Sequence, residues 1–162
     1  MNAQPTPQFT LEHIEGHSVS LSDYRGKLVV VAFSGRGTAE QMAEAINTIR
    51  TKYDHEQLPI LAVADMGEIP RPARPIAKRK LKSAYEEAVK TASAKLQGAG
   101  KPVPPGAQLV VMLPDWKGEV ASSFGLADVD KEVVMVLVDA DGGVRGQGRG
   151  DQAAQQILAL FV

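Results

Sequence analysis

The stretch Gly35-Arg36-Gly37-Thr38 links a valine-rich apolar run to a segment with helical spacing. A helix N-terminus offers unpaired N–H groups and a partial positive charge, and an arginine adds a charged fork. The stretch therefore predicts an anion-binding turn. The simpler interpretation is structural, because the glycines suit a turn and Thr38 with Gln41 would form a capping box at the helix start. A P-loop is excluded, because no lysine follows the glycines.

A second group of charges lies between residues 71 and 101, which hold nine of the eighteen basic residues and only two acidic ones. Lys78, Arg79, Lys80 and Lys82 predict a basic patch for an acidic partner, a nucleic acid or an anionic surface. The alternative is the solvated face of an inserted helix. We expect no nucleic acid, because the net charge is −1 and no aromatic residues are interleaved with the basic ones.

No residue spacing in the chain is typical of a metal site. The three histidines are scattered on elements expected at the surface, and none has zinc-ligand spacing. Aspartates near the ends of the apolar runs could together ligate a hard cation, although strand-end aspartates usually cap loops. We therefore expect no metal and no cofactor. These histidines and aspartates are His13, His17, His55, Asp65, Asp115 and Asp139.

Length and composition indicate one ordinary globular domain over residues 1–162, with 44% apolar and 23% charged residues. Residues 1–7 are expected to form a loose arm, and residues 71–106 a basic helical insert with its loop. No run is apolar and long enough for a membrane span, and the N-terminus lacks the pattern of a signal peptide. The prediction is a cytoplasmic protein if the chain is full length, and a periplasmic or other extracytoplasmic one if a signal was removed.

The expected elements alternate between strands and helices, which indicates an α/β sandwich. Continuous apolar runs predict buried strands, and apolar residues at helical spacing predict helices packed on a sheet. A turn at Asp141-Gly142-Gly143 predicts a C-terminal hairpin. The expected strands are 9–11, 17–21, 28–33, 59–64, 108–113, 132–138 and 144–148. The expected helices are one that follows Thr38 as its N-cap, and 76–96, 119–124 and 152–161.

Several local motifs resemble the redoxin branch of the thioredoxin-like superfamily, the AhpC/TSA type. Together they cover most of the chain, and the SLSDYRGK stretch is the most specific of them. The resemblance implies a three-layer α/β fold with a central mixed sheet, helices on both faces and an N-terminal β-hairpin. The motifs are Phe9-Thr10-Leu11, residues 19–27, residues 29–33, Asp115, GEVASSFG at residues 118–125 and VDADG at residues 138–142.

The resembling family carries its reactive cysteines at the helix start, as C-x-x-C in disulfide reductases or T-x-x-C in peroxiredoxins. Those positions correspond to Thr38 and Gln41 here, and the chain has no cysteine at all. A glutamine amide has neither the nucleophilicity nor the redox states of a thiolate. Just before the last central strand, reductases place a cis-proline and peroxiredoxins an arginine, whereas this chain has Val133. Thiol oxidoreductase and peroxidase activity are therefore not expected.

A narrower resemblance is to the YtfJ-type family, thioredoxin-like bacterial proteins that are mostly exported, lack C-x-x-C and have no assigned function. The segments that carry it are residues 33–40, FSGRGTAE, and residues 64–70, ADMGEIP. This chain departs from that family by lacking the usual export signal.

The leading hypothesis is a redox-inactive thioredoxin-fold protein that binds a partner or a small anion at the rim of the former active site. A second hypothesis is a residual non-thiol enzyme that uses Arg36, Thr38 and Glu40 with a strand-end aspartate; it requires convergent ionisable groups in a cleft. A third is a scaffold module of a larger assembly, which would expose a large apolar patch. The partner and the oligomeric state do not follow from the sequence.

Overall fold

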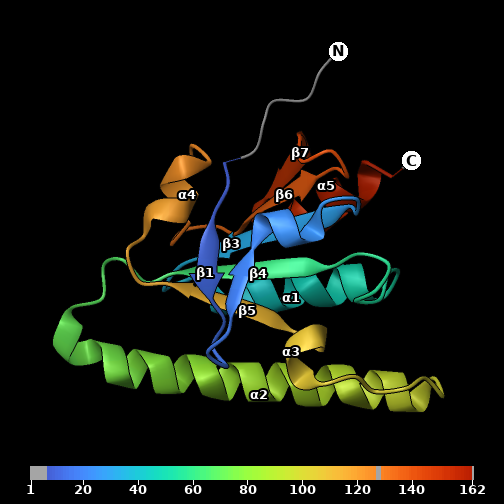
Figure 1. Ribbon diagram of the computed structural model, residues 1–162, viewed down its shortest axis with the longest axis horizontal. Coiled ribbons are helices and arrows are strands. Elements are labelled where there is room, and N and C mark those ends of the chain that lie inside the picture. Colours follow the sequence, from blue (N-terminus) through green and yellow to red (C-terminus); the bar gives the residue numbers. More distant parts are fainter. Residues whose placement is uncertain (1–6, 127–128, 162) are drawn as a thin grey trace.

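The computed structural model describes residues 7–126 and 129–161, and these form a five-stranded sheet with helices and a separate two-stranded hairpin (Figure 1). Apart from Pro7, the arm expected at residues 1–7 lies outside the described residues. The elements are β1 (Thr10–Glu12), β2 (Ser18–Ser20), η1 (Leu21–Tyr24), β3 (Val29–Ser34), α1 (Ala39–Arg50), β4 (Ile60–Asp65), η2 (Arg71–Ala73), α2 (Arg74–Gly98), α3 (Gly106–Leu109), β5 (Val111–Asp115), α4 (Glu119–Ser123), β6 (Val134–Val138), β7 (Val144–Arg149), η3 (Gly150–Gln152) and α5 (Ala153–Ala159).

The main sheet is mixed, with the strand order β5-β4-β3-β6-β7. Strands β3, β4 and β5 run parallel, whereas β6 is antiparallel to β3 and β7 is antiparallel to β6. All six residues of the central strand β3 are buried, as expected for a valine-rich strand that is covered on both faces. The mixed sheet and the N-terminal hairpin confirm the predicted fold class.

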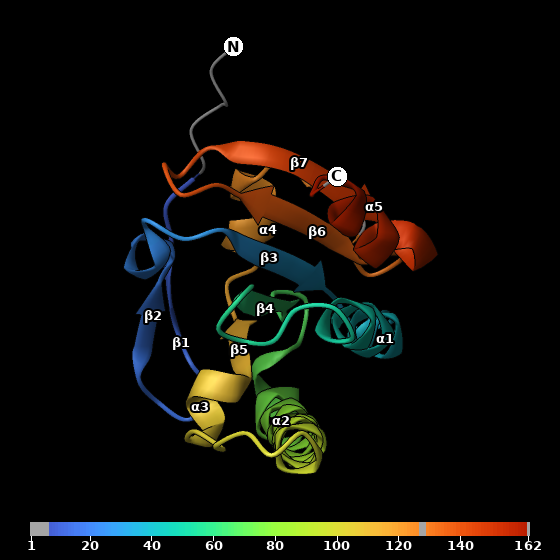
Figure 2. The ribbon, with the colours of Figure 1, turned by 90° about the vertical axis from the view of Figure 1, so that its right-hand side faces the viewer.

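The side chains of β3 alternate between two apolar cores, one on each face of the sheet. Val29, Val31 and Phe33 pack with residues of the hairpin, η1 and α4. Val30 and Ala32 pack with residues of α1 and α5. Figure 2 shows the hairpin on one side of the sheet and α1 with α5 on the other. The two cores therefore give the three-layer arrangement that the sequence predicts.

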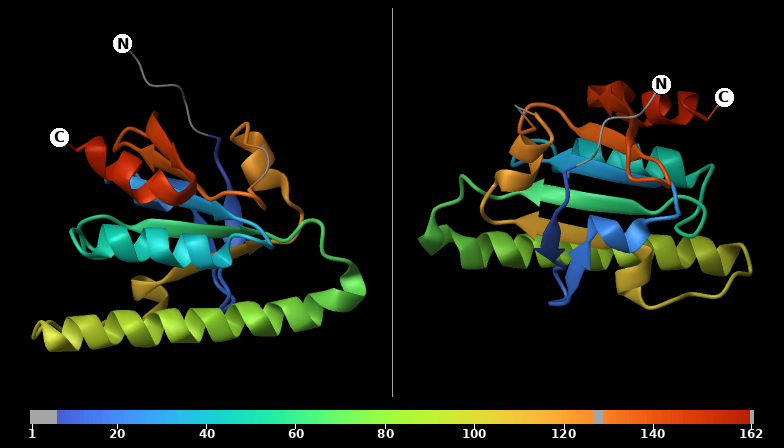
Figure 3. Two further views of the ribbon diagram at one scale, coloured as in Figure 1. Left: turned by 180° about the vertical axis from the view of Figure 1, so that it is seen from behind. Right: turned by 45° about the horizontal axis from the view of Figure 1, so that its top comes forward.

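Helix α2 lies beside β5 at the edge of the sheet (Figures 1 and 3). Neither core includes a residue of this 25-residue helix, and only Tyr85 and Leu96 are buried in it. The rings of Tyr85 and His13 pack edge to face, with ring centroids 5.3 Å apart. Gly106 of α3 lies close to Tyr85 and Val89. The helix is thus attached to the body through a few contacts, near its middle and at its first residue, Arg74.

Helix α2 starts earlier than the sequence predicts. The prediction begins at residue 76, but the helix begins at Arg74 and includes Pro75 in its first turn. Proline is tolerated there because the first N–H groups of a helix have no partner within the helix. Lys78, Arg79, Lys80 and Lys82 consequently lie two residues further into the helix than predicted.

Two strands start later than the sequence predicts. Gln108, predicted in a strand, lies in the short helix α3, and β5 begins at Val111. The next predicted strand begins at residue 132, but β6 begins at Val134. Glu132 and Val133 instead belong to the bend that leads into β6, and this bend faces the candidate site described next.

Candidate functional site

The carboxyl ends of β3, β4 and β5 lie together at one end of the sheet, because the three strands run parallel. At this end the turn Gly35–Gln41 leads from β3 into α1, and residues 129–133 lead into β6 alongside it. We call these two segments together the rim. It contains Thr38 and Gln41, which the sequence predicts to correspond to the cysteine positions of the resembling family.

Thr38 holds the turn to the segment before β6. Its side chain is buried, with the residue only 3% exposed. The hydroxyl Oγ1 donates to the carbonyl oxygen of Val129 at 2.8 Å and accepts from the backbone N–H of Gly35 at 2.9 Å. Both contacts lie outside the helix, so Thr38 stands at the N-cap position without capping an N–H group of α1.

Gln41, which the sequence predicts to correspond to a peroxiredoxin cysteine, connects three separate segments. Its Oε1 accepts from the backbone N–H of Val133 at 2.6 Å, and its Nε2 donates to Asp151 Oδ1 at 2.7 Å. The capping box predicted for Thr38 and Gln41 is therefore wrong, because both side chains bond to distant segments instead. Local spacing gave no signal of this, since the partners of Gln41 lie 92 and 110 residues along the chain.

Val133 has both of its backbone groups bonded within the chain. Its N–H donates to Gln41, and its carbonyl oxygen accepts from Gly150 N–H at 2.8 Å. Its side chain is fully buried in the core beneath α1 and α5. This position therefore has no free backbone group with which to pair an extended partner chain.

Asp130 places a carboxylate against the turn, a feature that the sequence analysis missed. Its Oδ1 accepts from the backbone N–H of Arg36 at 3.0 Å. A Cβ atom on Gly35 would overlap the Asp130 side chain, and one on Gly37 would lie 2.8 Å from the Asp130 carbonyl oxygen. The two glycines are thus required by close approach of the neighbouring segment, and one N–H group of the predicted anion site already bonds to a carboxylate of the chain.

Arg36 and Glu40 are the exposed charged residues of the turn. Within the part of the chain that the structure describes, neither side chain takes part in a hydrogen bond or ion pair. The non-thiol enzyme hypothesis needs these groups to converge with Thr38 and an aspartate. The Thr38 hydroxyl makes two hydrogen bonds and is buried, and the Asp130 carboxylate bonds to the backbone of Arg36 rather than to its side chain, so the described geometry lends that hypothesis no support.

The aspartates at the strand ends hold turns. Asp115 is 3% exposed and accepts from the N–H groups of Gly118 and Val120 at 3.1 and 2.9 Å, which positions the start of α4. Asp65 accepts from Gly67 N–H at 3.0 Å. Asp139 lies at the opposite end of the sheet, because β6 runs antiparallel to β3. The three therefore cannot share one cation, and no cluster that could hold a metal is found among residues 7–126 and 129–161.

His13 is buried rather than at the surface as predicted, with the residue 1% exposed. Its Nε2 lies 3.0 Å from the carbonyl oxygen of Val110, and its Nδ1 accepts from Glu15 N–H at 3.0 Å. The ring also stacks on His17, with centroids 4.6 Å apart. These bonds suit the neutral ring, which donates at Nε2 and accepts at Nδ1. Burial lowers the pKa of His13, the Val110 hydrogen bond opposes this, and the nearby His17 lowers it further.

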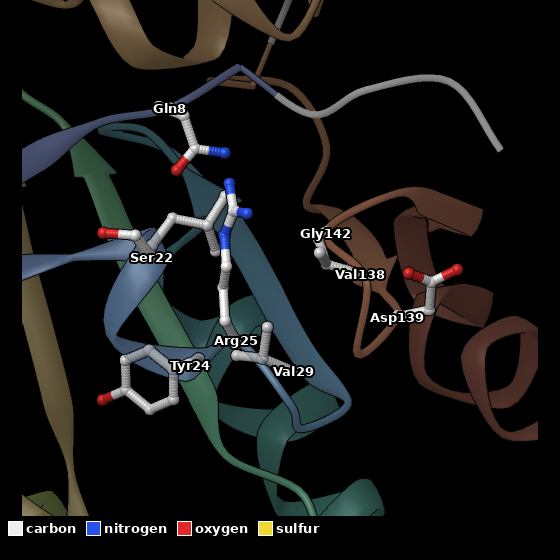
Figure 4. A pocket seen from close by; sticks show the side chains of 9 residues that line it. Gln8, Ser22, Tyr24, Arg25, Val29, Val138, Asp139 and Gly142 are labelled. Atoms are coloured by element: carbon white, nitrogen blue, oxygen red, sulfur yellow. The ribbon is translucent and has the colours of Figure 1, made fainter.

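A small hollow lies at the end of the sheet opposite the rim, next to the amino end of β3 (Figure 4). It has room for about one water molecule. Arg25 extends into it toward Gln8, and Asp139 lies on its far side (Figure 4). This size does not suit a substrate or cofactor, so the rim stays the candidate functional site.

The AhpC/TSA family model matches residues 3–147 of the chain. No curated protein matches it in sequence. Among solved structures, the exposed lipoprotein thioredoxin Etrx1 of Streptococcus pneumoniae is 18% identical, with a TM-score of 0.62 over 94% of this chain and 98% of that one. The thioredoxin domain of a thiol-disulfide oxidoreductase from Bacteroides vulgatus is also 18% identical, with a TM-score of 0.61 over 98% and 97% of the two chains.

These likenesses establish the thioredoxin-like fold. Separately, no described helix is long and apolar enough to cross a membrane. The family match covers the rim, including Thr38, Gln41 and Val133. The narrower YtfJ-type resemblance stays a prediction.

Proposed function

The chain belongs to the AhpC/TSA family, and we propose that it acts by binding a partner protein at the rim, without redox chemistry. The observation that carries this proposal is the role of Gln41. At the position of the reactive cysteine, its amide bonds to both Val133 and Asp151. An uncharged amide whose oxygen and nitrogen are both hydrogen-bonded within the chain connects segments of the fold. It cannot perform a thiol reaction.

A protein partner is favoured over a small anion at the turn. An anion at the turn would have to share it with the Asp130 carboxylate, which already accepts from Arg36 N–H. Two like charges at one site repel each other. The exposed side chains of Arg36 and Glu40 carry opposite charges, and a protein surface can complement both at once.

A scaffold module would bury a large apolar patch against its neighbours. In the described chain the exposed large apolar residues are Ile76, Val103 and Leu160, which belong to α2, the loop after it and the end of α5. This separation favours a contact through charged side chains over an extended apolar interface.

The proposal is tested with a photoreactive amino acid introduced in place of Arg36 or Glu40 in the producing cells. Both positions are exposed, and their side chains have no partner in the described chain. We expect crosslinks to the same protein from both positions, identified by mass spectrometry. Lys27 and Lys52, exposed at the opposite end of the sheet, are the matched control positions. Equal crosslinking from all four positions, or peroxide or disulfide turnover by the purified protein, would contradict the proposal.

A second experiment restores the missing thiol. Gln41→Cys places a cysteine at the start of α1, where the helix dipole favours the thiolate. We expect the thiol to react with a disulfide reagent but to reduce peroxide no faster than a free thiol. Sustained peroxidase turnover would mean that the rim is a dormant thiol site rather than a binding surface.

We further propose an extracytoplasmic location. The support is that the structural neighbour from Streptococcus pneumoniae is described as an exposed lipoprotein. Fractionation of the producing cells, with cytoplasmic and extracytoplasmic marker proteins followed in parallel, tests this. Recovery of the protein with the cytoplasmic marker would overturn it.

A further inference from the structure

Between Arg74 and Tyr85, the first half of α2 is an exposed surface in which no residue is buried. The helix has 25 residues, about 37 Å at 1.5 Å per residue. Both of its buried residues, Tyr85 and Leu96, lie beyond its first ten positions, and neither apolar core draws a described residue from it. Figures 1 and 3 show its first turns extending along the sheet edge beyond the hairpin. Core packing therefore does not explain the residues chosen for these turns.

Positive charge is concentrated in this half of the helix. Residues 71–82 contain six basic residues and no acidic one. Arg74 has a structural role, because it donates to the carbonyl oxygens of Ile69 and Trp116 at 3.4 and 3.3 Å and its guanidinium lies 5.7 Å from the centre of the Trp116 ring. Within the described residues no ion pair involves any side chain of α2. The cationic groups of Lys78, Arg79, Lys80 and Lys82 are exposed.

This arrangement of charge opposes helix stability. Like-charged side chains four residues apart on a helix, such as Lys78 and Lys82, repel each other, and the helix dipole favours acidic residues in the first turn. Here the first turn has no acidic residue, four cations occupy residues 78–82, and the last turn has only Lys95. Residues that break a local stability rule without a compensating contact in the fold are typical of functional surfaces.

The cations also gather on one side of the helix. At about 100° per residue, Lys78, Arg79 and Lys82 project within an arc of about 100°, and Lys80 points to the opposite side. Lys78 and Lys82 are one turn apart and therefore neighbours on the surface. We call Lys78, Arg79 and Lys82 the basic face.

We propose that the basic face is the docking surface for an acidic segment of the partner protein. This inference rests on the proposed function. The start of α2 lies at the carboxyl ends of the parallel strands, as the rim does, because Arg74 ties it to the loop after β5. Carboxylates of the partner complement the unpaired cations, and the opposite charges steer its approach and orient it toward the rim.

Two other polyanions fit the same charges less well. Nucleic acid is disfavoured, because residues 71–82 contain no aromatic residue for base stacking and the whole chain has a net charge of −1. A membrane-binding helix presents a continuous apolar face to the lipid. In this half of α2 the only exposed large apolar residue is Ile76. The chemistry therefore points to a protein ligand.

The test measures binding of the whole protein to three labelled probes: a peptide rich in glutamate and aspartate, a single-stranded DNA and vesicles containing phosphatidylglycerol. The variants are Lys78→Glu/Lys82→Glu and the matched control Lys27→Glu/Lys52→Glu, which changes the net charge equally at the opposite end of the sheet. Measurements are made at about 150 mM salt, where the Debye length is about 8 Å and distant charges are screened.

We expect the peptide to bind the unmodified protein and the Lys78/Lys82 variant to bind it about tenfold or more weakly, a change of about 1.4 kcal/mol or more. The control should lose less than about twofold, below about 0.4 kcal/mol. Lys78→Gln/Lys82→Gln, which only removes charge, should lie between. Circular dichroism verifies that each variant is folded.

No peptide binding, equal losses in the two charge-reversal variants, or tighter binding to DNA or vesicles than to the peptide would overturn the inference. Its failure is distinguishable from failure of the proposed function. Crosslinks from Arg36 and Glu40 would persist if only the basic face were wrong. They would be absent, while the peptide still bound, if only the rim were wrong.

Discussion

The rim lies at the carboxyl ends of the parallel strands, where α2 also begins. The rim and the first half of α2 nevertheless use their polar groups in opposite ways. At the rim, the side chains of Thr38, Gln41 and Asp130 bond to groups elsewhere in the chain. On α2, the cations of Lys78 and Lys82 have no ion-pair partner among the described residues. The rim thus joins segments of the fold, whereas the helix presents charge to the outside.

The two regions also differ in how they are held. At the rim, hydrogen bonds between residues far apart in the sequence connect α1 to the segment before β6 and to the segment before α5. Helix α2 is held by the Tyr85 contact with His13, the approach of Gly106 and the contacts of Arg74. Substitutions in the rim should therefore change stability, and substitutions on the exposed part of α2 should change binding alone.

The largest expected loss of stability comes from Thr38→Val. This change keeps the shape of the side chain but leaves the Val129 carbonyl and the Gly35 N–H without their partner. Because an unsatisfied buried group costs about 1–3 kcal/mol, we expect a loss of about 2–4 kcal/mol, measured by urea unfolding. Thr48→Val is the control, since Thr48 bonds only within α1, and should change stability by less than about 1 kcal/mol. Equal losses would mean that the rim is not a joint.

The next effect is at His13, which supports Tyr85 and hence α2. We expect His13→Gln to lose about 2–3 kcal/mol, because it disrupts hydrogen bonds and ring contacts at a buried site. The folded pKa of His13 is lowered, so the unfolded chain binds the proton more tightly. Stability should therefore be retained above the ordinary pKa of about 6.5 and fall as the pH drops through it toward the folded value.

The pH experiment measures urea unfolding between about pH 5 and pH 8, a range that includes the ordinary histidine pKa. The charged and titratable groups that face His13 are His17, Glu15 and Tyr85. His13→Gln should flatten the pH dependence of stability, and the control His55→Gln should preserve it. A pH dependence unchanged by His13→Gln would remove His13 as its source.

A smaller loss is expected from Gln41→Leu. This change removes the bonds to Val133 and Asp151 at a half-buried position, so we expect a loss of about 1–2 kcal/mol. A double-mutant cycle with Asp151→Asn isolates the Gln41–Asp151 bond and should give a coupling energy of about 0.5–1.5 kcal/mol. A coupling energy near zero would show that Gln41 does not join α1 to the segment before α5.

The smallest effect on stability is expected from Lys78→Glu/Lys82→Glu. Replacing two of the clustered cations in the second and third turns of α2 should leave the thermal unfolding temperature unchanged or raise it slightly, because fewer like charges then repel one another, with a gain of at most about 1 kcal/mol. A loss of more than about 2 kcal/mol would contradict the comparison, because it would show that the fold depends on these side chains.

Much of the fold was predictable because periodic patterns report burial. The valine-rich run of β3 and the strand after α1 were predicted within a residue of their observed bounds. The start of β5 was less predictable, since Pro105 precedes a short helix that converts Gln108 from an apparent strand residue into a helical one. The beginning of β6 shifted for a similar reason, because the bend at Val133 serves the rim.

The site was less predictable than the fold. The position of the rim followed from the resemblance and from the strand-to-helix junction. The capping box at Thr38 was a local expectation that a stronger set of distant hydrogen bonds replaced. Asp130 carried no signal, since an aspartate in a polar loop is ordinary until the fold brings it beside Arg36.

By itself the sequence determined that no thiol chemistry can occur, because the chain has no cysteine, and that six cations cluster in residues 71–82. Only the tertiary structure decided that Gln41 connects α1 to two distant segments, that His13 is buried and that α2 lies outside both apolar cores. The physical reason is the distance along the chain between the residues that interact. Periodicity and composition describe neighbours along the chain, whereas the bond from Thr38 to Val129 and the two bonds of Gln41 join residues that are 91 to 110 positions apart.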